Sequence, residues 1–381
     1  MLRIICFTPQ GYGLAEKIAG RMPAEVYRKL HTEEASGWTP GQTEEALAEA
    51  PLTENKKCPF VATEVTVPLS AWAAEGFTAG DPLLFIGAAG IAVRAIAGCV
   101  RDKLTDVPVL VMDVLGDYVI PILSGHVGGA NALAAELSEI TGAVPVITTA
   151  TDRTGAFAAD LFAKEYGMRI RNPKALPRVS GRAVAGAKIR IAWQEGAKEP
   201  AGRILEQIRG ICGVPEGTCM VSPEEPADIR ITLGPLPADI LKEKDILYLT
   251  PRCLYAGIGC RKDIPAGQLE AFVREQCEDL GLDAEALAGI ASIDVKKKEP
   301  AILSLAKGLG IPFRTYTAEE LREVPGDFPE SAFVEEQVGV GEVSGRAAMC
   351  LAGREGWLIL PKAVGQGITF SLACNLGDRT V

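Results

Sequence analysis

A glycine-rich segment that joins an apolar run to a helix-forming run constrains the fold more than any other feature of the chain. It reads Leu123-Ser124-Gly125-His126-Val127-Gly128-Gly129-Ala130-Asn131-Ala132. The apolar run before it, Tyr118–Leu123, predicts a buried strand. The Ala-, Leu- and Glu-rich run over 130–140 predicts a helix. A strand that passes through a tight glycine turn into a helix is typical of α/β domains.

The same segment has the chemical character of an anion-binding turn. Its glycines allow a ligand to approach the backbone closely, and the first turn of the helix is expected to present unpaired N–H groups to an anionic group. His126 lies in this turn and is one of two histidines in the chain, and an imidazole exchanges protons near neutral pH. The alternative is a tight connection without function, in which Ser124 or His126 caps the helix. The binding residues that the functional interpretation names are Ser124, Gly125, Gly128, Gly129 and Asn131.

A second polar segment, Val146-Ile147-Thr148-Thr149-Ala150-Thr151-Asp152, begins within the next predicted strand, 144–148. Hydroxyl groups at the end of a strand often only satisfy backbone groups of the loop. On the functional interpretation, Thr148, Thr149 and Asp152 hold a substrate beside His126. Both segments are expected to end strands at the same edge of one sheet, where open α/β sheets bind ligands.

A third glycine-bearing segment, 87–94, lacks the G-x-G-x-x-G spacing and therefore does not predict a dinucleotide site. Its small residues either permit close packing of a helix on the sheet or, around Gly90, form part of a binding site. Arg94, Arg101 and Lys103 are either solvated surface charges or groups that hold carboxylates.

In the last third of the chain, Gly257-Ile258-Gly259-Cys260-Arg261 is expected to form a turn after a strand. Cys260 has no nearby histidine that would support a nucleophilic thiolate, so an inert thiol is the favoured interpretation. The run Lys296-Lys297-Lys298-Glu299 is typical of a solvated turn, although its position after a strand also permits contact with a ligand.

Strand-like and helix-like runs alternate along the chain, which predicts a multi-domain α/β protein with mostly parallel sheets flanked by helices. A length of 381 residues suits two or three domains of roughly 150 residues each. We expect an N-terminal domain at 1–150, a middle segment at 151–248 and a separate C-terminal α/β domain at 252–381, with 241–245 as the linker that closes the middle segment. Residues 32–62 are expected to form a solvated excursion, and His31 to lie at the surface.

Composition excludes several classes of function. The net charge of −10 disfavours non-specific binding to nucleic acid. No apolar run approaches the roughly 18 residues of a membrane span. The ten cysteines form no C-x-x-C pair and no Cys/His cluster, which predicts reduced thiols in a cytoplasmic protein and no structural zinc site. A G-x-S-x-G elbow, a P-loop and an H-E-x-x-H motif are absent from the sequence.

Taken together, these segments resemble the cobalt-precorrin-5A hydrolase family, CbiG, of anaerobic cobalamin biosynthesis. The resemblance covers most of the chain and is carried by residues 86–94, 123–131 and 146–152, and in the last third by 257–261, the Lys298-Glu299 pair and 343–348. Two departures occur. Asp106-Val107-Pro108 stands where an Asp-Pro pair is expected, and Val343-Ser344-Gly345-Arg346 stands where an acidic V-x-E-A form is expected.

The resemblance implies a cobalt-bearing tetrapyrrole substrate with a δ-lactone that bridges ring A and a meso carbon. Water opens the lactone, and a two-carbon unit leaves as acetaldehyde to give cobalt-precorrin-5B. The cobalt belongs to the substrate, so no cofactor and no protein-bound metal are expected. The substrate-binding residues that follow from this interpretation are Gly90, Arg94, Ser124, Gly125, Gly128, Gly129, Asn131, Thr148, Thr149, Gly259, Arg261, Lys298 and Glu299.

The expected mechanism assigns His126 as the group that activates water or accepts a proton, with the N–H groups of Gly128 and Gly129 stabilising the oxyanion. Asp152 or His126 assists the second proton transfer. Arg94, Arg101, Arg261 and Lys298 pair with peripheral carboxylates of the macrocycle.

Two other functions use the same residues. One is a non-catalytic corrinoid or tetrapyrrole carrier, and the other is an enzyme for a phosphorylated metabolite with 124–129 as a phosphate cradle. Other enzymes of the pathway are the candidate protein partners, and the C-terminal domain is a candidate interaction module. The sequence does not predict an oligomeric state.

Overall fold

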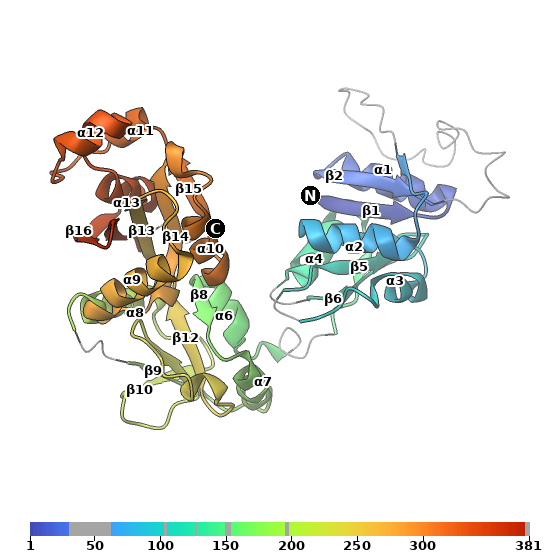
Figure 1. Cartoon of the computed structure of the whole chain (residues 1–381). Coiled ribbons are helices and arrows are strands. Elements are labelled where there is room, and N and C mark those ends of the chain that lie inside the picture. The colour runs from blue at the N-terminus through green and yellow to red at the C-terminus, as the bar shows by residue number, and fades with distance from the viewer. Residues whose placement is uncertain (30–61, 103–104, 126–127, 149–153, 195–197, 378–381) are drawn as a thin grey trace. The chain divides into compact units, whose positions relative to one another are not determined.

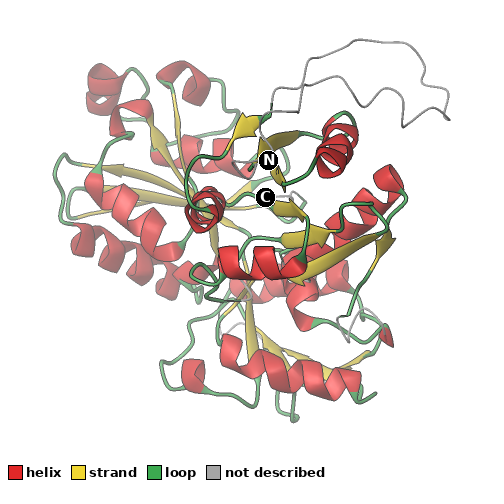
Figure 2. Cartoon of the chain, turned by 90° about the vertical axis from the view of Figure 1, so that its right-hand side faces the viewer, coloured by secondary structure: helices red, strands yellow, loops and turns green. Residues whose placement is uncertain are grey.

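The computed structural model describes residues 1–29, 62–102, 105–125, 128–148, 154–194 and 198–377, apart from the side chains of Phe333 and Val334. The chain divides into two compact units, Met1–Thr154 and Gly155–Val381. In each unit, mostly parallel sheets are flanked by helices (Figures 1 and 2). The α/β class expected from the sequence is confirmed. The division of the second unit into a middle and a C-terminal domain stays a prediction.

The first unit contains a seven-stranded sheet with the order β3-β2-β1-β4-β5-β6-β7. Strands β1 to β5 run parallel to one another, whereas β6 pairs antiparallel with β5 and parallel with β7. The strands are β1 (Leu2–Cys6), β2 (Ala24–Arg28), β3 (Thr63–Glu64), β4 (Leu83–Ile86), β5 (Val109–Met112), β6 (Tyr118–Leu123) and β7 (Val144–Pro145).

Alternating side chains of the central strands build two separate cores on the two faces of this sheet. In β1, Leu2, Ile4 and Cys6 face the core that contains α1 and α4, whereas Ile5 faces the core that contains α2 and α3. This period of two is what a strand buried on both faces requires. The helices are α1 (Pro9–Ala19), α2 (Leu69–Ala79), α3 (Ala89–Ile96) and α4 (Ala130–Thr141).

Helix α1 begins four residues before the predicted start at residue 13. Thr8 forms its N-cap and accepts a hydrogen bond from the Gly11 amide at 3.2 Å, and Pro9 occupies the first helical position. Both are established start signals, and they outweigh the helix-weakening glycines that follow.

Strand β6 is less buried than the apolar run 118–123 predicts. Val119 is fully buried, but Tyr118 is 51% exposed and the remaining residues are half-buried. The reason lies in the neighbouring strand. Because β7 contains only Val144 and Pro145, its pairing covers the first part of β6, and the described residues provide no partner strand for the rest of that edge.

The middle part of the second unit is a five-stranded sheet with the order β10-β9-β11-β12-β8, in which only β8 is antiparallel. Strand β12 follows residues 241–245 and belongs to this sheet, so the prediction that this stretch closes the middle segment is wrong. The elements are α6 (Ala159–Glu165), β8 (Met168–Ile170), α7 (Leu176–Val184), β9 (Ile189–Trp193), α8 (Ala201–Cys212), β10 (Thr218–Val221), β11 (Ile229–Ile231) and β12 (Leu247–Pro251).

The C-terminal part is a second five-stranded sheet with the order β15-β14-β13-β17-β16. Strands β13 to β15 are parallel, and the hairpin of β16 and β17 pairs antiparallel with β13. The elements are β13 (Leu254–Cys260), α9 (Ala266–Asp279), β14 (Leu287–Ile293), α10 (Pro300–Leu309), β15 (Phe313–Tyr316), α11 (Ala318–Arg322), α12 (Ala332–Val338), α13 (Ser344–Ala352), β16 (Trp357–Gly365) and β17 (Ile368–Cys374).

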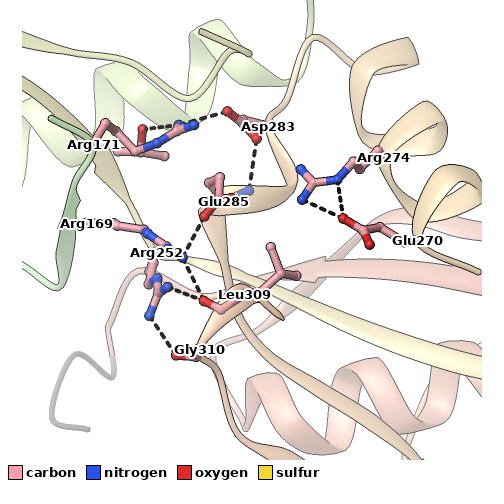
Figure 3. Close-up of polar contacts among 10 residues, drawn as sticks. Arg169, Arg171, Arg252, Glu270, Arg274, Asp283, Glu285, Leu309 and Gly310 are labelled. Carbon is pink, nitrogen blue, oxygen red and sulfur yellow. Dashed lines mark hydrogen bonds and ion pairs between the residues drawn. The ribbon is translucent and has the colours of Figure 1, made fainter. Parts of the chain in front are cut away.

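An arginine cluster joins these two sheets within the second unit (Figure 3). Arg171, which follows β8, pairs with Asp283 at 2.8 Å, and both side chains are 8% exposed. Arg169 in β8 pairs with Glu285 at 2.6 Å. Arg252 donates to the Leu309 carbonyl at 2.7 Å, and burial together with the neighbouring Arg169 lowers the pKa of Arg252 to about 10. These side chains satisfy the last carbonyls of α10 and neutralise the buried acids.

We expect Arg171→Leu to lower the free energy of unfolding of the second unit by about 3–5 kcal/mol, because Asp283 would stay buried without its cation. Urea denaturation followed by circular dichroism measures the change. Arg274→Leu is the matched control. It removes an exposed pair with Glu270 and should cost less than about 1 kcal/mol. Equal effects of the two substitutions would contradict this account.

Candidate functional site

The glycine turn predicted from the sequence lies where β6 ends and α4 begins. Ser124 adopts a positive φ of 55°, and its hydroxyl donates to the Asp106 carbonyl at 2.7 Å. Gly129, with φ at 90°, is the N-cap of α4 and makes no side-chain cap. The interpretation of Ser124 as the capping residue is therefore wrong, because its side chain fastens the turn to the segment that precedes β5.

Two glycines of this turn have no room for a side chain. A Cβ atom at Gly128 would lie 2.4 Å from the Ser124 Cβ and 2.8 Å from the Ser124 carbonyl oxygen. A Cβ atom at Gly125 would lie 2.7 Å from the Asn131 Oδ1. The turn is thus folded tightly on itself, and any larger residue at Gly128 would displace backbone atoms.

The backbone of the turn also occupies the first amide groups of α4. The Ala130 N–H donates to the Ser124 carbonyl at 3.1 Å, and the Asn131 N–H donates to the Gly125 carbonyl at 3.0 Å. The expectation that the first helical turn presents unpaired N–H groups is therefore wrong for these two residues. The amide groups of Gly128 and Gly129 have no acceptor within the described part of the chain, so they are the donors that a ligand could use.

The second predicted segment follows β7, and the parallel pairing of β6 with β7 confirms that both strands run to the same edge of the sheet. Thr148 is exposed at the end of this segment. His126, Thr149 and Asp152 lie outside the described residues, as do His31 and Lys103. Their roles stay predictions.

Asp106 is a residue of this region that the functional interpretation of the sequence missed. It is 8% exposed, and its carboxylate accepts hydrogen bonds from the amides of Arg101 (2.9 Å) and Asp102 (3.1 Å). Asp106 therefore holds the segment that carries Arg101 beside Ser124. An aspartate before a Val-Pro strand start is a recognisable loop-capping signal, because its side chain accepts from nearby backbone groups.

Gly90 and Arg94 lie at the opposite edge of the sheet. Met112 of β5 pairs with Ile86, the last residue of β4, on one side and with Val119 of β6 on the other. Because β6 runs in the opposite direction, Ser124 lies beyond the level of Leu83, the first residue of β4. Measured along the strands, Ser124 is therefore roughly 13 Å from the level of Ile86. The antiparallel direction of β6 causes this separation. Arg94 folds back on its own helix and donates to the Gly90 carbonyl at 3.0 Å.

In the second unit, the segment 257–261 does not form the expected turn, because Gly257, Gly259 and Cys260 belong to β13. A Cβ atom at Gly257 would lie 1.7 Å from the Ser344 carbonyl oxygen of α13. Gly257 is therefore the position where α13 packs directly on β13. A glycine inside a strand often marks such a close approach of two backbones, which the periodicity of the sequence does not reveal.

A cavity of about 250 Å³ lies at the carboxyl ends of β13 and β14, and Gly259, Cys260 and Arg261 line it. Burial raises the pKa of the Cys260 thiol, which argues against a catalytic thiolate. Lys298 is exposed, whereas Glu299 is 6% exposed and pairs with Lys296 at 2.9 Å.

A further cavity of about 670 Å³ lies on the middle sheet, where the sequence predicts no functional residue. The cavity is lined by Trp193, Gly202, Leu205, Glu206, Arg209, Met220, Val221, Ser222 and Pro223.

The described residues contain no group of three metal-binding side chains. No helix among them has the length and apolar character needed to cross a bilayer.

Comparison with known proteins confirms the resemblance seen in the sequence. Residues 71–152 match the family model described as Cobalamin synthesis G N-terminal, and residues 254–373 match the one described as Cobalamin synthesis G C-terminus. A solved structure of a cobalamin biosynthesis protein G homolog from Sulfolobus solfataricus aligns over 98% of this chain and 96% of that one, with 20% identity and a TM-score of 0.33.

Two curated relatives carry the same name, cobalt-precorrin-5A hydrolase. The protein of Salmonella typhimurium is 36% identical over 374 residues, which are 97% of each chain. The protein of Priestia megaterium is 30% identical over 299 residues, which are 76% of this chain and 78% of that protein. The chain therefore belongs to the cobalamin synthesis G (CbiG) family.

Proposed function

We propose that the chain is a cobalt-precorrin-5A hydrolase, which opens the δ-lactone of its cobalt-tetrapyrrole substrate and releases acetaldehyde to give cobalt-precorrin-5B. The observation that carries this proposal is the 36% identity with the Salmonella typhimurium hydrolase along 97% of both chains. The enzyme acts on a small molecule in the cytoplasm, binds neither nucleic acid nor membrane, and takes its cobalt with the substrate.

Hydrolysis of a lactone needs a base for the attacking water and donors for the oxyanion that develops on the carbonyl oxygen. His126 is the base in this proposal, and the amide groups of Gly128 and Gly129 are the donors. The amides of Ala130 and Asn131 do not serve, because carbonyls of the turn already accept from them. Asp152 or His126 then assists the proton transfer that accompanies loss of acetaldehyde.

Ser124 is a positioning residue in this mechanism. Its hydroxyl donates to the Asp106 carbonyl, so its proton is engaged in fastening the turn. Water is therefore the nucleophile. Thr148 and Thr149 contact the substrate from the adjoining loop, and Arg101 pairs with a peripheral carboxylate at this edge of the sheet.

Gly90 and Arg94 lie at the other sheet edge. If they bind substrate, they contact a region about 13 Å or more from the lactone.

The direct test is to incubate the purified chain with cobalt-precorrin-5A under anaerobic conditions and to measure acetaldehyde by mass spectrometry. Release of acetaldehyde in proportion to enzyme and time is the expected result. Tight binding of the substrate without acetaldehyde would instead identify a corrinoid carrier. Competition of binding by inorganic phosphate would favour an enzyme for a phosphorylated metabolite.

We expect His126→Ala to lower kcat/KM for acetaldehyde release by about 10²–10⁴-fold, because a well-placed general base contributes that much to the rate. Substrate affinity, measured by equilibrium titration, should change much less. His126→Gln keeps hydrogen-bonding capacity without a titrating group and should be equally slow. Near-normal release of acetaldehyde by either variant would reject the assignment of His126.

We expect Gly128→Ala to lower kcat/KM by about 10-fold or more, since the new Cβ would push against backbone atoms of Ser124 and move the oxyanion donors. Overpacking of this kind should also lower the free energy of unfolding by about 1–3 kcal/mol. The matched control is Gly98→Ala, where a Cβ atom has nothing within 4 Å. Steady-state kinetics and urea denaturation measure both effects, and identical behaviour of the two variants would contradict the account of the turn.

A further inference from the structure

The cavity in the C-terminal part of the second unit has an apolar body and a basic surround. It lies in the crevice beyond the carboxyl ends of the parallel strands β13 and β14, where open α/β sheets bind ligands. Its apolar walls are formed by Ile293, Val295, Val338 and Val343. Val295 is 67% exposed, so part of this apolar surface faces the opening.

Three cationic side chains reach this cavity from three separate elements. Arg261 follows β13, Lys296 ends the short 3-10 helix Asp294–Lys296 after β14, and Lys362 belongs to β16. Lys296 is neutralised by Glu299 at 2.9 Å. Neither Arg261 nor Lys362 has a carboxylate partner among the residues that the structure describes.

The acidic residue of the cavity, Glu342, forms no ion pair with Arg261 or Lys362 among the described residues. Glu342 is 1% exposed, and its carboxylate accepts hydrogen bonds from the Ser344 hydroxyl (2.6 Å) and from the amides of Gly345 (2.8 Å) and Arg346 (3.0 Å). It is committed to the first turn of α13, where the helix dipole already favours an anion. With Arg261, Lys296 and Lys362 set against Glu299 and Glu342, the side chains at the cavity carry a net positive charge, and neither Arg261 nor Lys362 forms an ion pair within the described part of the chain.

The backbone holds the start of the Arg261 side chain in place. The Arg261 amide donates to the Gly367 carbonyl at 2.9 Å, and a Cβ atom at Gly367 would lie 2.9 Å from the Arg261 Cδ. Gln366 and Gly367 have φ values of 54° and 78°, as the two central residues of a type I′ hairpin turn require. The arginine stem therefore lies across a residue that cannot carry a side chain without a clash.

We propose that this cavity is a second substrate-binding site of the enzyme, which takes one carboxylate-bearing edge of the tetrapyrrole through Arg261 and Lys362. The identity of the ligand rests on the proposed function. A volume of about 250 Å³ is below the 300–1,000 Å³ of sites for whole drug-sized ligands, so it suits one substituted edge of a macrocycle. Apolar walls beside Arg261 and Lys362, of which Lys362 donates, among the described residues, only to the Pro329 carbonyl at 3.5 Å, suit a carboxylate on a hydrocarbon stem better than a hydrated inorganic anion.

Cys260 provides a local probe, because it lines the cavity and is half-buried. The full-length chain is treated with iodoacetamide at increasing concentrations of cobyrinic acid, a corrinoid with free carboxylates, and alkylation is followed by peptide mass spectrometry. Cys260 should be protected about tenfold or more at saturation. Cys219 of β10 is the internal control, and its alkylation should not change.

We expect Arg261→Gln and Lys362→Gln each to raise the concentration needed for half-protection by about tenfold, the effect of losing one hydrogen bond to a charged group. Lys307→Gln, at an exposed position in the last turn of α10, should leave it unchanged. The methyl ester of cobyrinic acid lacks free carboxylates. Its protection of Cys260 should therefore be the same in the parent chain and in the two variants.

Three results would overturn the proposal: protection that survives both substitutions, equal protection by the methyl ester, or equal protection by inorganic phosphate alone. The acetaldehyde assay separates this proposal from the proposed function. A chain that releases acetaldehyde but fails the protection test keeps its function and loses this site. A chain that passes the protection test without releasing acetaldehyde keeps the site as that of a corrinoid-binding protein.

Discussion

The reversal of chain direction at β6 is the constraint on which the candidate site of the first unit depends. Because β6 pairs antiparallel with β5, the glycine turn leaves the sheet at the edge where β1, β4 and β5 begin. The turn therefore meets Asp106 and the segment of Arg101, while the glycine turn after β4 lies at the other edge. The Ser124 hydroxyl, bonded to the Asp106 carbonyl, fixes this junction.

The second unit contains two separate sheets, and buried charged groups hold them together. Its buried Arg171–Asp283 pair and the carbonyls at the end of α10 do so through charged hydrogen bonds. The removal of one partner from such a pair is costly, so the pair couples the two sheets. Further along the same unit, two cations near the end of the C-terminal sheet have no such acidic partner within the described part of the chain. This contrast distinguishes the structural arginines from Arg261 and Lys362.

Much of the fold could be predicted from the sequence. Strands β4 and β5 are continuous apolar runs, and the helices α4 and α10 lie within one residue of their expected bounds. The errors have physical causes. The pattern around Gly257 predicts a turn, whereas in the structure this glycine permits close contact between α13 and β13. Such long-range packing has no local pattern in the sequence. Helix α1 begins at Pro9, four residues before the predicted start, because Thr8 and Pro9 supply start signals that outweigh the glycines in its first turns.

The α/β class, the family and the residue types of the glycine turn could be predicted from the amino-acid sequence, because they depend on local periodicity and on motifs that are contiguous in the chain. Three features required the folded chain: the occupied amides of Ala130 and Asn131, the position of Gly90 at the opposite sheet edge from Ser124, and the cavity that Arg261 shares with Lys362. Strand direction and hydrogen-bond partners are set by contacts between distant residues, and no local pattern contains them.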